Sequence, residues 1–308
     1  MRKIFCIGEM LIDLVAETSF DKAKTFGKNP GGAPANVAAQ IAKLGQNVAF
    51  LGNIGNDSFG NFLVNTLHDL NINDTYISRY GKTTLAFVQL DNHGERDFEF
   101  YRGHDDEYKL PHQLSQQITH KDIIHFGSAT ALLGGNLYNS YFQLLDIALD
   151  KNAFISFDPN FRDNLISQAS IEEYVIDCKK IISCANLVKM NELELQLISG
   201  EDDIDLAIKA ISQITNAITI ITLGAEGSIL VQDNQAIPIA SRHTKQVDST
   251  GAGDAFVGTV LAQIAQTPEK PWEEIITIAN FAGSYTCQKH GAIPAMPNME
   301  QLMSYINA

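Results

Sequence analysis

The feature that most constrains the fold of this chain is a regular alternation of short strand-like runs with helical segments, starting at about residue 122. Four strands are expected, at Asp122–Phe126, Ala153–Phe157, Leu187–Lys189 and Ile218–Thr222, with helices near 137–150, 170–183 and 203–213 between them. Strands spaced by helices in this way form βαβ units, which build a mostly parallel sheet with helices on both faces.

The rest of the chain extends the same α/β pattern. Further strands, helices and one hairpin are expected at Lys3–Ile7, 34–44, Val48–Gly52, about 58–70, 228–240, 252–266 and 273–287. The sequence shows no internal repeat, low-complexity tract or linker. Residues 1–308 are therefore expected to form a single domain.

One region lacks helical periodicity and has a different composition, at about 75–101. Leu85–Leu90 and Phe98–Tyr101 are β-rich, and Asp91–Glu95 between them is turn-like. Together with residues 14–18, they are expected to form a small antiparallel flap. A flap of this kind exposes an apolar face that a second copy of the chain commonly covers, so we expect a homodimer.

The charge of the chain limits its partners. The formal net charge is −14, and the acidic residues are spread along the sequence. Such a surface repels phosphate backbones, so nucleic acid is not an expected partner. A site for a polyanion such as ATP would have to use helix N-termini, glycine-rich backbone, a bound cation or a few placed arginines.

Membrane and metal signals are weak in this sequence. No apolar stretch approaches the roughly 18–20 residues that cross a bilayer, and Glu9 and Asp13 interrupt the apolar N-terminal region. A cytoplasmic protein without a membrane partner is therefore expected.

The four cysteines are scattered, without the close spacing of a zinc site. Buried, reduced thiols are the expected state.

The run Gly251-Ala-Gly-Asp254 precedes an apolar helical run and would place free backbone N–H groups at a helix N-terminus. Such groups bind phosphate without a positive side chain. Asp254 falls in the first turn, where the helix dipole favours the ionised carboxylate that a proton acceptor needs. Acidic residues also occur there simply as dipole partners, but the two glycines favour a functional site. The run has neither the third glycine of a dinucleotide fingerprint nor the spacing of a P-loop.

A second glycine-rich segment, Gly31-Gly-Ala-Pro-Ala-Asn36, also lies between a loop and a helix start. Its glycines allow a ligand to approach the backbone, and Asn36 can both donate to and accept from hydroxyl groups. Taken alone, the segment is explained more simply as a tight turn before a helix that begins with proline.

Polar or glycine-rich segments follow four of the expected strands. In open α/β sheets ligands bind beyond the carboxyl ends of the strands, so these segments predict one site. The residues concerned are Asp13, then Asp158, Asn160 and Arg162, then Asn191 and Glu194, then Thr222–Gly227.

On these residues, the chain resembles the PfkB (ribokinase-like) carbohydrate kinases along nearly its whole length. Gly31-Gly-Ala-Pro-Ala-Asn-Val-Ala38 resembles the first signature of that family, and Asp248-Ser-Thr-Gly-Ala-Gly-Asp-Ala-Phe256 resembles the second. The resemblance implies a ribokinase-like three-layer α/β/α fold with a mostly parallel central sheet and a small inserted β lid. It also implies ATP-dependent phosphorylation of a small-molecule sugar.

The resemblance assigns a role to each matching position. Asp254 would be the base, and Gly251, Ala252 and Gly253 would form an anion hole. The substrate would be bound by Asp13, Gly31, Gly32, Asn36, Phe98, Phe100, Arg102 and Arg162. Asn191, Glu194, Thr222, Gly224, Gly227 and Asn280 would bind the nucleotide, with Glu194 holding Mg²⁺ through water. Asp248, Thr250 and Gly291 match positions that hold a monovalent cation, usually K⁺.

The identity of the sugar stays open between related activities. The first signature, Phe100-Tyr-Arg102, His125–Ser128 and Asp158–Arg162 are most similar to fructokinases, which favours D-fructose phosphorylated on its 6-hydroxyl. A 2-keto-3-deoxygluconate kinase is the main competing assignment, because Arg102 and Arg162 could bind a carboxylate. The sequence also leaves open a riboside kinase, a catalytically silent sugar-binding regulator and a dinucleotide-dependent oxidoreductase.

Overall fold

The structure is a computed structural model, and it describes residues 2–16, 18–90 and 96–308, with side chains left out at residues 90 and 96–98. Its centre is an eight-stranded sheet in the order β14-β13-β12-β11-β10-β9-β1-β4. These strands are β1 (Ile4–Ile7), β4 (Val48–Leu51), β9 (Ile123–Phe126), β10 (Phe154–Phe157), β11 (Leu187–Asn191), β12 (Ile218–Thr222), β13 (Ser228–Gln232) and β14 (Gln235–Ile239). Pairing is parallel from β4 to β12 and antiparallel from β12 to β14, which confirms the mostly parallel sheet.

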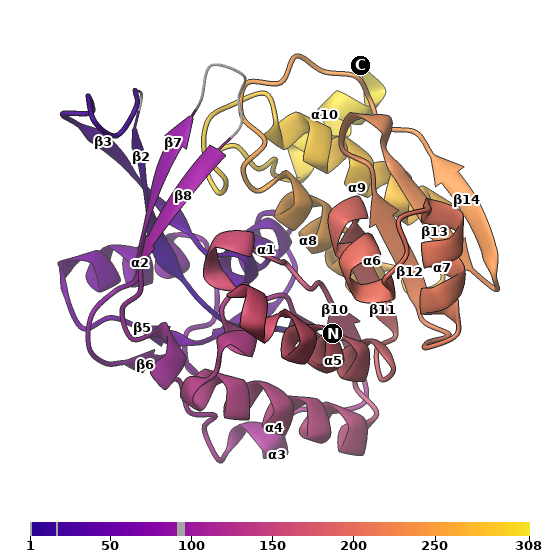
Figure 1. The fold of residues 1–308 in the computed structure, drawn as a ribbon, viewed down its shortest axis with the longest axis horizontal. Coiled ribbons are helices and arrows are strands. Elements are labelled where there is room, and N and C mark those ends of the chain that lie inside the picture. Colours follow the sequence, from indigo (N-terminus) through magenta and orange to yellow (C-terminus); the bar gives the residue numbers. More distant parts are fainter. Residues whose placement is uncertain (1, 17, 91–95) are drawn as a thin grey trace.

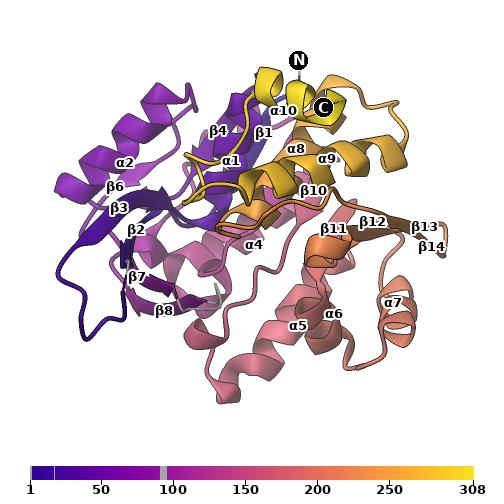
Figure 2. The same ribbon diagram turned by 90° about the horizontal axis from the view of Figure 1, so that it is seen from above.

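Helices cover both faces of this sheet, and Figure 2 shows the resulting three layers. The helices are α1 (Ala33–Lys43), α2 (Ser58–Asp69), α3 (Leu114–Gln117), α4 (Gly135–Lys151), α5 (Ile171–Ile182), α6 (Glu192–Ser199), α7 (Ile204–Ser212), α8 (Ala252–Gln266), α9 (Trp272–Thr286) and α10 (Met299–Asn307). One apolar core packs the sheet against α4–α7, and a second packs it against α1, α2, α8 and α9. Alternate residues of β1 enter the two cores, which explains its continuous apolar sequence.

A smaller four-stranded sheet stands beside the central one (Figure 1). Its order is β3-β2-β7-β8, formed by β3 (Phe26–Gly31), β2 (Leu11–Ala16), β7 (Leu85–Leu90) and β8 (Arg96–Tyr101). The β2–β7 pair is parallel, so the sheet is not purely antiparallel. We call these four strands the small sheet.

Several elements differ from the expectation drawn from sequence. In the small sheet, β7 and β8 fall within the expected 75–101 and β2 overlaps the expected 14–18, but β2 begins earlier, at Leu11, and β3 was not expected. The segment before β7 contributes β6 (Ser78–Arg79), which instead pairs with β5 (Asn53–Ile54). Of the helices that the structure describes, none has the length and apolar character needed to cross a membrane.

Candidate active site

A cavity of about 400 Å³ lies at the carboxyl ends of β10, β11 and β12, between the start of α8 and the small sheet. It brings together residues from both glycine-rich motifs and from all the strand ends singled out in the sequence. Of the expected site residues, Asp13, Gly32, Asn36, Phe100, Arg162, Asn191, Glu194, Thr222, Gly224, Thr250, Gly251, Gly253 and Asp254 line it.

The two motifs meet at a hydrogen bond within this cavity. The Nδ2 atom of Asn36 on α1 donates to Oδ2 of Asp254 on α8 over 2.8 Å. The two helices approach closely because Gly258 on α8 has no side chain. A Cβ at that position would lie 2.7 Å from Cβ of Gln40 on α1. Asn36 Oδ1 is buried and has no hydrogen-bond partner within the described chain. An acceptor is therefore available beside the Asp254 carboxylate.

The Asp254 carboxyl group has a perturbed acidity. Burial raises its pKa from the ordinary 3.8 to about 6, although the Asn36 amide and the Arg162 charge act in the opposite direction. A carboxylate of this pKa is ionised at neutral pH and is a stronger base than an ordinary aspartate.

Gly251 and Gly253, which precede Asp254, are glycines for different physical reasons. Gly251 caps α8 in the left-handed region at φ 72°, and a Cβ there would lie 2.6 Å from Cβ of Ala292. Packing and backbone conformation therefore both require glycine at Gly251. A Cβ on Gly253 would meet, among the described residues, only Nζ of Lys189, at 3.7 Å. The protein itself has room for a side chain at Gly253, so a bound ligand is the better reason for its absence.

The first signature lies against the start of β2. A Cβ on Gly31 would lie 2.4 Å from Oδ2 of Asp13, and a Cβ on Gly32 would lie 2.5 Å from the Glu9 carbonyl. These glycines bring the motif into contact with β2. Asp13 pairs with Ala86 and Ala86 with Phe100, so Asp13 and Phe100 share one face of the small sheet, toward the cavity. The Phe98 side chain, a further expected substrate contact, lies outside the described residues.

A second cavity of about 210 Å³ adjoins the first. Both are lined by Thr222, Gly224 and Gly253, and the second also by Gly227, Ala252 and Asn280. The Nδ2 atom of Asn280 donates to Ser228 Oγ and to the Ile239 carbonyl, each over 3.1 Å, which ties α9 to the β13–β14 hairpin. The expected nucleotide residues thus line two adjoining cavities, and Asp254 lines the first of them.

Asn191 and Glu194 form a capping box at the start of α6. Asn191 Oδ1 accepts from the Glu194 N–H, and Glu194 Oε2 accepts from the Asn191 N–H, both over 2.8 Å. The other oxygen, Oε1, accepts from the Phe161 N–H over 3.0 Å. With both oxygens engaged, Glu194 fits a role on Mg²⁺ through water. Within the described residues, no cluster of three His, Cys, Asp or Glu side chains is arranged to hold a metal.

The residues expected to hold a monovalent cation do come together. Asp248 Oδ1 accepts from the N–H and the hydroxyl of Thr250 over 2.8 and 2.6 Å, and Oδ2 accepts from the Gly291 N–H over 2.8 Å. The carboxylate therefore links the loop before α8 to the loop after α9.

Arg102 is the expected site residue that the structure places elsewhere. Its Nη2 atom lies 2.9 Å from Oδ2 of the buried Asp105, and the residue lines a separate cavity beside α5. The pair with Asp105 holds the guanidinium group away from Asp254. Of the two predicted arginines, Arg162 lines the main cavity and Arg102 does not.

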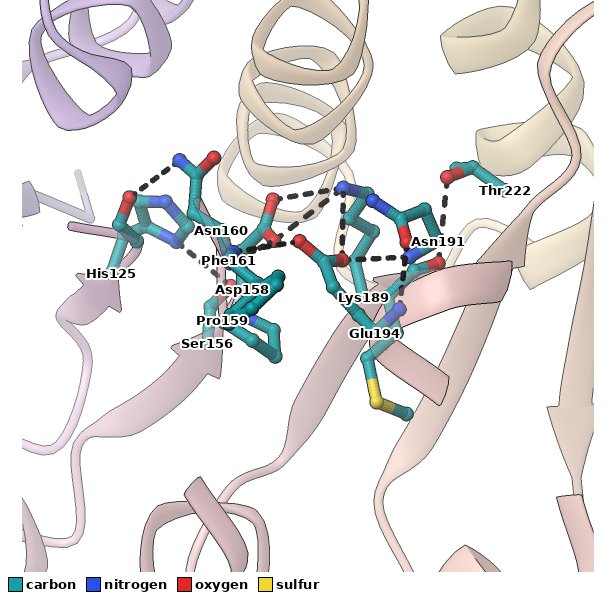
Figure 3. Close-up of polar contacts among 12 residues, drawn as sticks. His125, Ser156, Asp158, Pro159, Asn160, Phe161, Lys189, Asn191, Glu194 and Thr222 are labelled. Atoms are coloured by element: carbon teal, nitrogen blue, oxygen red, sulfur yellow. Dashed lines mark hydrogen bonds and ion pairs between the residues drawn. The ribbon is translucent and has the colours of Figure 1, made fainter. Parts of the chain in front are cut away.

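Lys189 and Glu9 line the cavity but were not recognised as site residues from sequence. Figure 3 shows Lys189 between Asp158 and Glu194, with its Nζ atom 3.2 Å from Asp158 Oδ2 and 3.9 Å from Glu194 Oε2. A lysine near the end of an otherwise apolar strand was the available signal. Glu9 accepts from Ser128 Oγ over 2.5 Å and from the Ala33 N–H over 3.2 Å, which joins α1 to the loop after β9.

The chain belongs to the pfkB family of carbohydrate kinases, because the profile described as "pfkB family carbohydrate kinase" matches residues 1–299. Among curated relatives, fructokinase-1 of Oryza sativa subsp. japonica is 36% identical over 318 aligned residues. That alignment covers 99% of this chain and 98% of the rice protein.

Solved structures agree in fold over the whole chain. The fructokinase of Vibrio cholerae O395, in a form with fructose, ADP and calcium ion bound, superposes with a TM-score of 0.87 at 28% identity and 99% coverage of both chains. The fructokinase of Xylella fastidiosa with bound ATP superposes with a TM-score of 0.85 at 28% identity, covering 99% of this chain and 98% of its own. The ribokinase-like fold expected from sequence is thereby confirmed.

Proposed function

We propose that this chain is an ATP-dependent fructokinase, which transfers the γ-phosphoryl group of ATP to the 6-hydroxyl of D-fructose. One observation carries the proposal: the hydrogen bond between Asn36 and Asp254 joins the first glycine-rich motif to the expected base, in a cavity that adjoins the one lined by Gly227 and Asn280. The choice of fructose is supported by the rice and Vibrio relatives, which are named fructokinases and align over nearly their full lengths.

Asp254 would accept the proton of the attacking hydroxyl. Its pKa of about 6 leaves it ionised at neutral pH, and the Asn36 amide fixes the orientation of its carboxylate. The buried Asn36 Oδ1 would accept a hydrogen bond from a second sugar hydroxyl. Asp13 and Phe100, on the cavity face of the small sheet, would bind the other side of the sugar.

The transferred phosphoryl group would lie at the start of α8. The N–H groups of Gly253 and Asp254 belong to the first turn, where donors have no acceptors within the helix and the dipole favours an anion. When bound, Mg²⁺ would neutralise charge on the phosphates, and Asn191 and Glu194 would hold it through water. These groups compensate for the acidity of the chain as a whole.

The small sheet would act as a lid over the sugar. Its cavity face carries Asp13 and Phe100, so closure would remove water that could otherwise hydrolyse ATP. Its opposite face carries Phe26, Phe87 and Tyr101, with ring centroids 5.4 and 5.3 Å apart along the series. Phe26 and Tyr101 are 37% and 56% exposed, and this aromatic surface supports a homodimer formed through the lids.

Two finer expectations need their own measurements. A K⁺ requirement is supported by the meeting of Asp248, Thr250 and Gly291, and it predicts higher activity in KCl than in NaCl at equal ionic strength. A cytoplasmic location stays a prediction that fractionation of the source cells would test.

A coupled assay of ADP formation against a panel of sugars tests the proposal. D-fructose should give the highest kcat/KM, above 2-keto-3-deoxygluconate, ribose and nucleosides. A carboxylate substrate is less favoured, because one of the two arginines expected to bind it is engaged elsewhere. Arg162 lines the cavity, whereas Arg102 is paired with Asp105. If kcat/KM were higher for 2-keto-3-deoxygluconate than for D-fructose, the assignment of fructose as the substrate would be wrong. If no sugar were turned over, the kinase assignment itself would be contradicted.

A further inference from the structure

The ammonium group of Lys189 lies beside the carboxylates of Asp158 and Glu194 (Figure 3). It also borders the start of α8, because a Cβ on Gly253 would lie 3.7 Å from Lys189 Nζ. We propose that Lys189 is a further catalytic residue, whose ammonium group donates to an oxygen of the phosphoryl group during its transfer to the sugar. The proposal rests on the kinase function proposed above and adds to it a side-chain cation within the anion hole.

The position of Lys189 follows from its strand. It lies on β11, two residues before the capping residue Asn191, with 10% of its side chain exposed. The chain folds a charged residue into this site because Asp158, at the end of the neighbouring β10, provides the counter-charge at 3.2 Å. Burial without such a partner would be strongly unfavourable.

Lys189 carries its positive charge in this environment. The carboxylates of Asp158 and Glu194, 3.2 and 3.9 Å from Nζ, favour the protonated form of the ammonium group. A protonated lysine can donate to a phosphoryl oxygen, and it does not compete with Asp254 for the hydroxyl proton.

The space between Lys189 and Gly253 has the right place and chemistry for a phosphoryl group. A methyl group on Gly253 would lie 3.7 Å from Lys189 Nζ, and in the described part of the chain no other heavy atom outside the local backbone comes within 4 Å of it. The helix N-terminus and the ammonium group therefore border the same space, and both attract an anion.

The two carboxylates keep other donors when the ammonium group turns toward a phosphate. Glu194 accepts from the N–H groups of Phe161 and Asn191 over 3.0 and 2.8 Å. Asp158 Oδ1 accepts from the Asn160 N–H over 3.2 Å. Neither carboxylate would thus be left without a hydrogen bond, which lowers the free-energy cost of the exchange.

The chemical step balances with Lys189 protonated throughout. The bond between the γ-phosphorus and the bridging oxygen of ADP breaks, and a bond from that phosphorus to the sugar oxygen forms. The hydroxyl proton passes to the Asp254 carboxylate. Lys189 neutralises part of the charge on the phosphoryl oxygens, which Asp254, as an anion, cannot do.

The test compares ATP and ADP binding to the full-length Lys189→Met variant by titration calorimetry with Mg²⁺ and without sugar. Because ADP lacks the γ-phosphate, we expect ATP affinity to fall by at least ~10-fold and ADP affinity to stay within ~3-fold of wild type. With fructose, kcat should fall by ~100-fold or more, the scale of a lost anion-hole donor. Equal losses for both nucleotides, or a kcat within tenfold of wild type, would overturn the proposal.

A second variant keeps the test valid if Lys189→Met does not fold. Lys189→Met/Asp158→Asn removes both members of the ion pair and leaves no unpaired buried charge from it. It should fold and still show the selective loss of ATP affinity. Recovery of wild-type turnover would mean that Lys189 serves only to neutralise Asp158, and the proposal would fail.

A matched control and the wild-type assay separate the ways in which the proposal could fail. Lys43→Met removes another partly buried lysine, which donates to the Ile293 and Met296 carbonyls away from the cavity. It should leave the ratio of ATP to ADP affinity unchanged. If the wild type binds ATP but does not phosphorylate fructose, the proposed function fails, while the nucleotide titrations still decide the role of Lys189.

Discussion

Asn36 Nδ2 lies 2.8 Å from Asp254 Oδ2, although the two residues are separated by 218 positions in the chain. The contact influences the acidity of the Asp254 carboxyl group as well as its position. A donor stabilises the ionised carboxylate, while burial raises its pKa to about 6. The pH dependence of catalysis is therefore predicted to depend on the amide of Asn36.

Asp254→Asn should lower kcat by at least ~100-fold, because the general base is lost. ATP affinity should stay close to wild type, since the backbone of α8 is unchanged. Calorimetry and the ADP-coupled assay measure the two quantities. A variant that retains more than a tenth of wild-type kcat would contradict the role assigned to Asp254.

The same substitution should stabilise the fold above pH 6. The pKa of Asp254 is about 6 in the folded state against an ordinary 3.8, so the folded state binds the proton more tightly. The contribution of Asp254 to stability is then lost as pH rises from about 4 through 6. Urea unfolding at pH 8 should show Asp254→Asn about 1–3 kcal/mol more stable than wild type. A variant less stable than wild type at pH 8 would contradict the raised pKa.

The rate with fructose should fall as pH drops through about 6, because protonated Asp254 cannot accept the hydroxyl proton. Asn36→Leu removes the amide donor, so the acidic limb of the kcat profile should move upward by about 1 pH unit. Gln40→Leu is a matched control, since Gln40 lies one turn further along α1 and its Nε2 donates to Thr259 Oγ1 over 3.4 Å. An identical acidic limb in Asn36→Leu and wild type would exclude the Asn36 amide as a determinant of the Asp254 pKa.

Gly251→Ala and Gly253→Ala should affect different properties of the protein, stability in the first case and kcat in the second. Gly251→Ala should lower the free energy of unfolding by more than about 1 kcal/mol, because φ is 72° and Ala292 blocks the Cβ. Gly253→Ala should unfold no more easily than wild type, since alanine favours helix over glycine. It should nevertheless lose kcat, because the methyl group enters the space between α8 and Lys189. If a folded Gly253→Ala variant kept wild-type kcat, the placement of the phosphoryl group in that space would be contradicted.

The sequence allows prediction of those parts of the fold where local pattern and burial agree. Strands such as β9 and β12 have apolar residues on both faces of the sheet, and the helices between them pack against it, so the alternation is visible in sequence. β3 was missed because Phe26-Gly-Lys-Asn-Pro-Gly31 contains two glycines and a proline and is partly exposed.

The site was predictable where a motif is local and was missed where partners meet only through the fold. Asn191 and Glu194 are three residues apart, and their pattern is visible along the chain. Lys189 appears in sequence as the end of a strand, and its pairing with Asp158 depends on the order of β10 and β11. Arg102 resembled a substrate ligand, but Asp105, three residues away, binds its guanidinium group.

The most direct test of the central claim identifies the product of the wild-type protein with ATP, Mg²⁺ and ¹³C-labelled D-fructose by phosphorus and carbon NMR. The account predicts fructose 6-phosphate and ADP in equal amounts, with Asp254→Asn forming neither at a comparable rate. Phosphorylation at another hydroxyl, or ADP formation that does not depend on fructose, would contradict it.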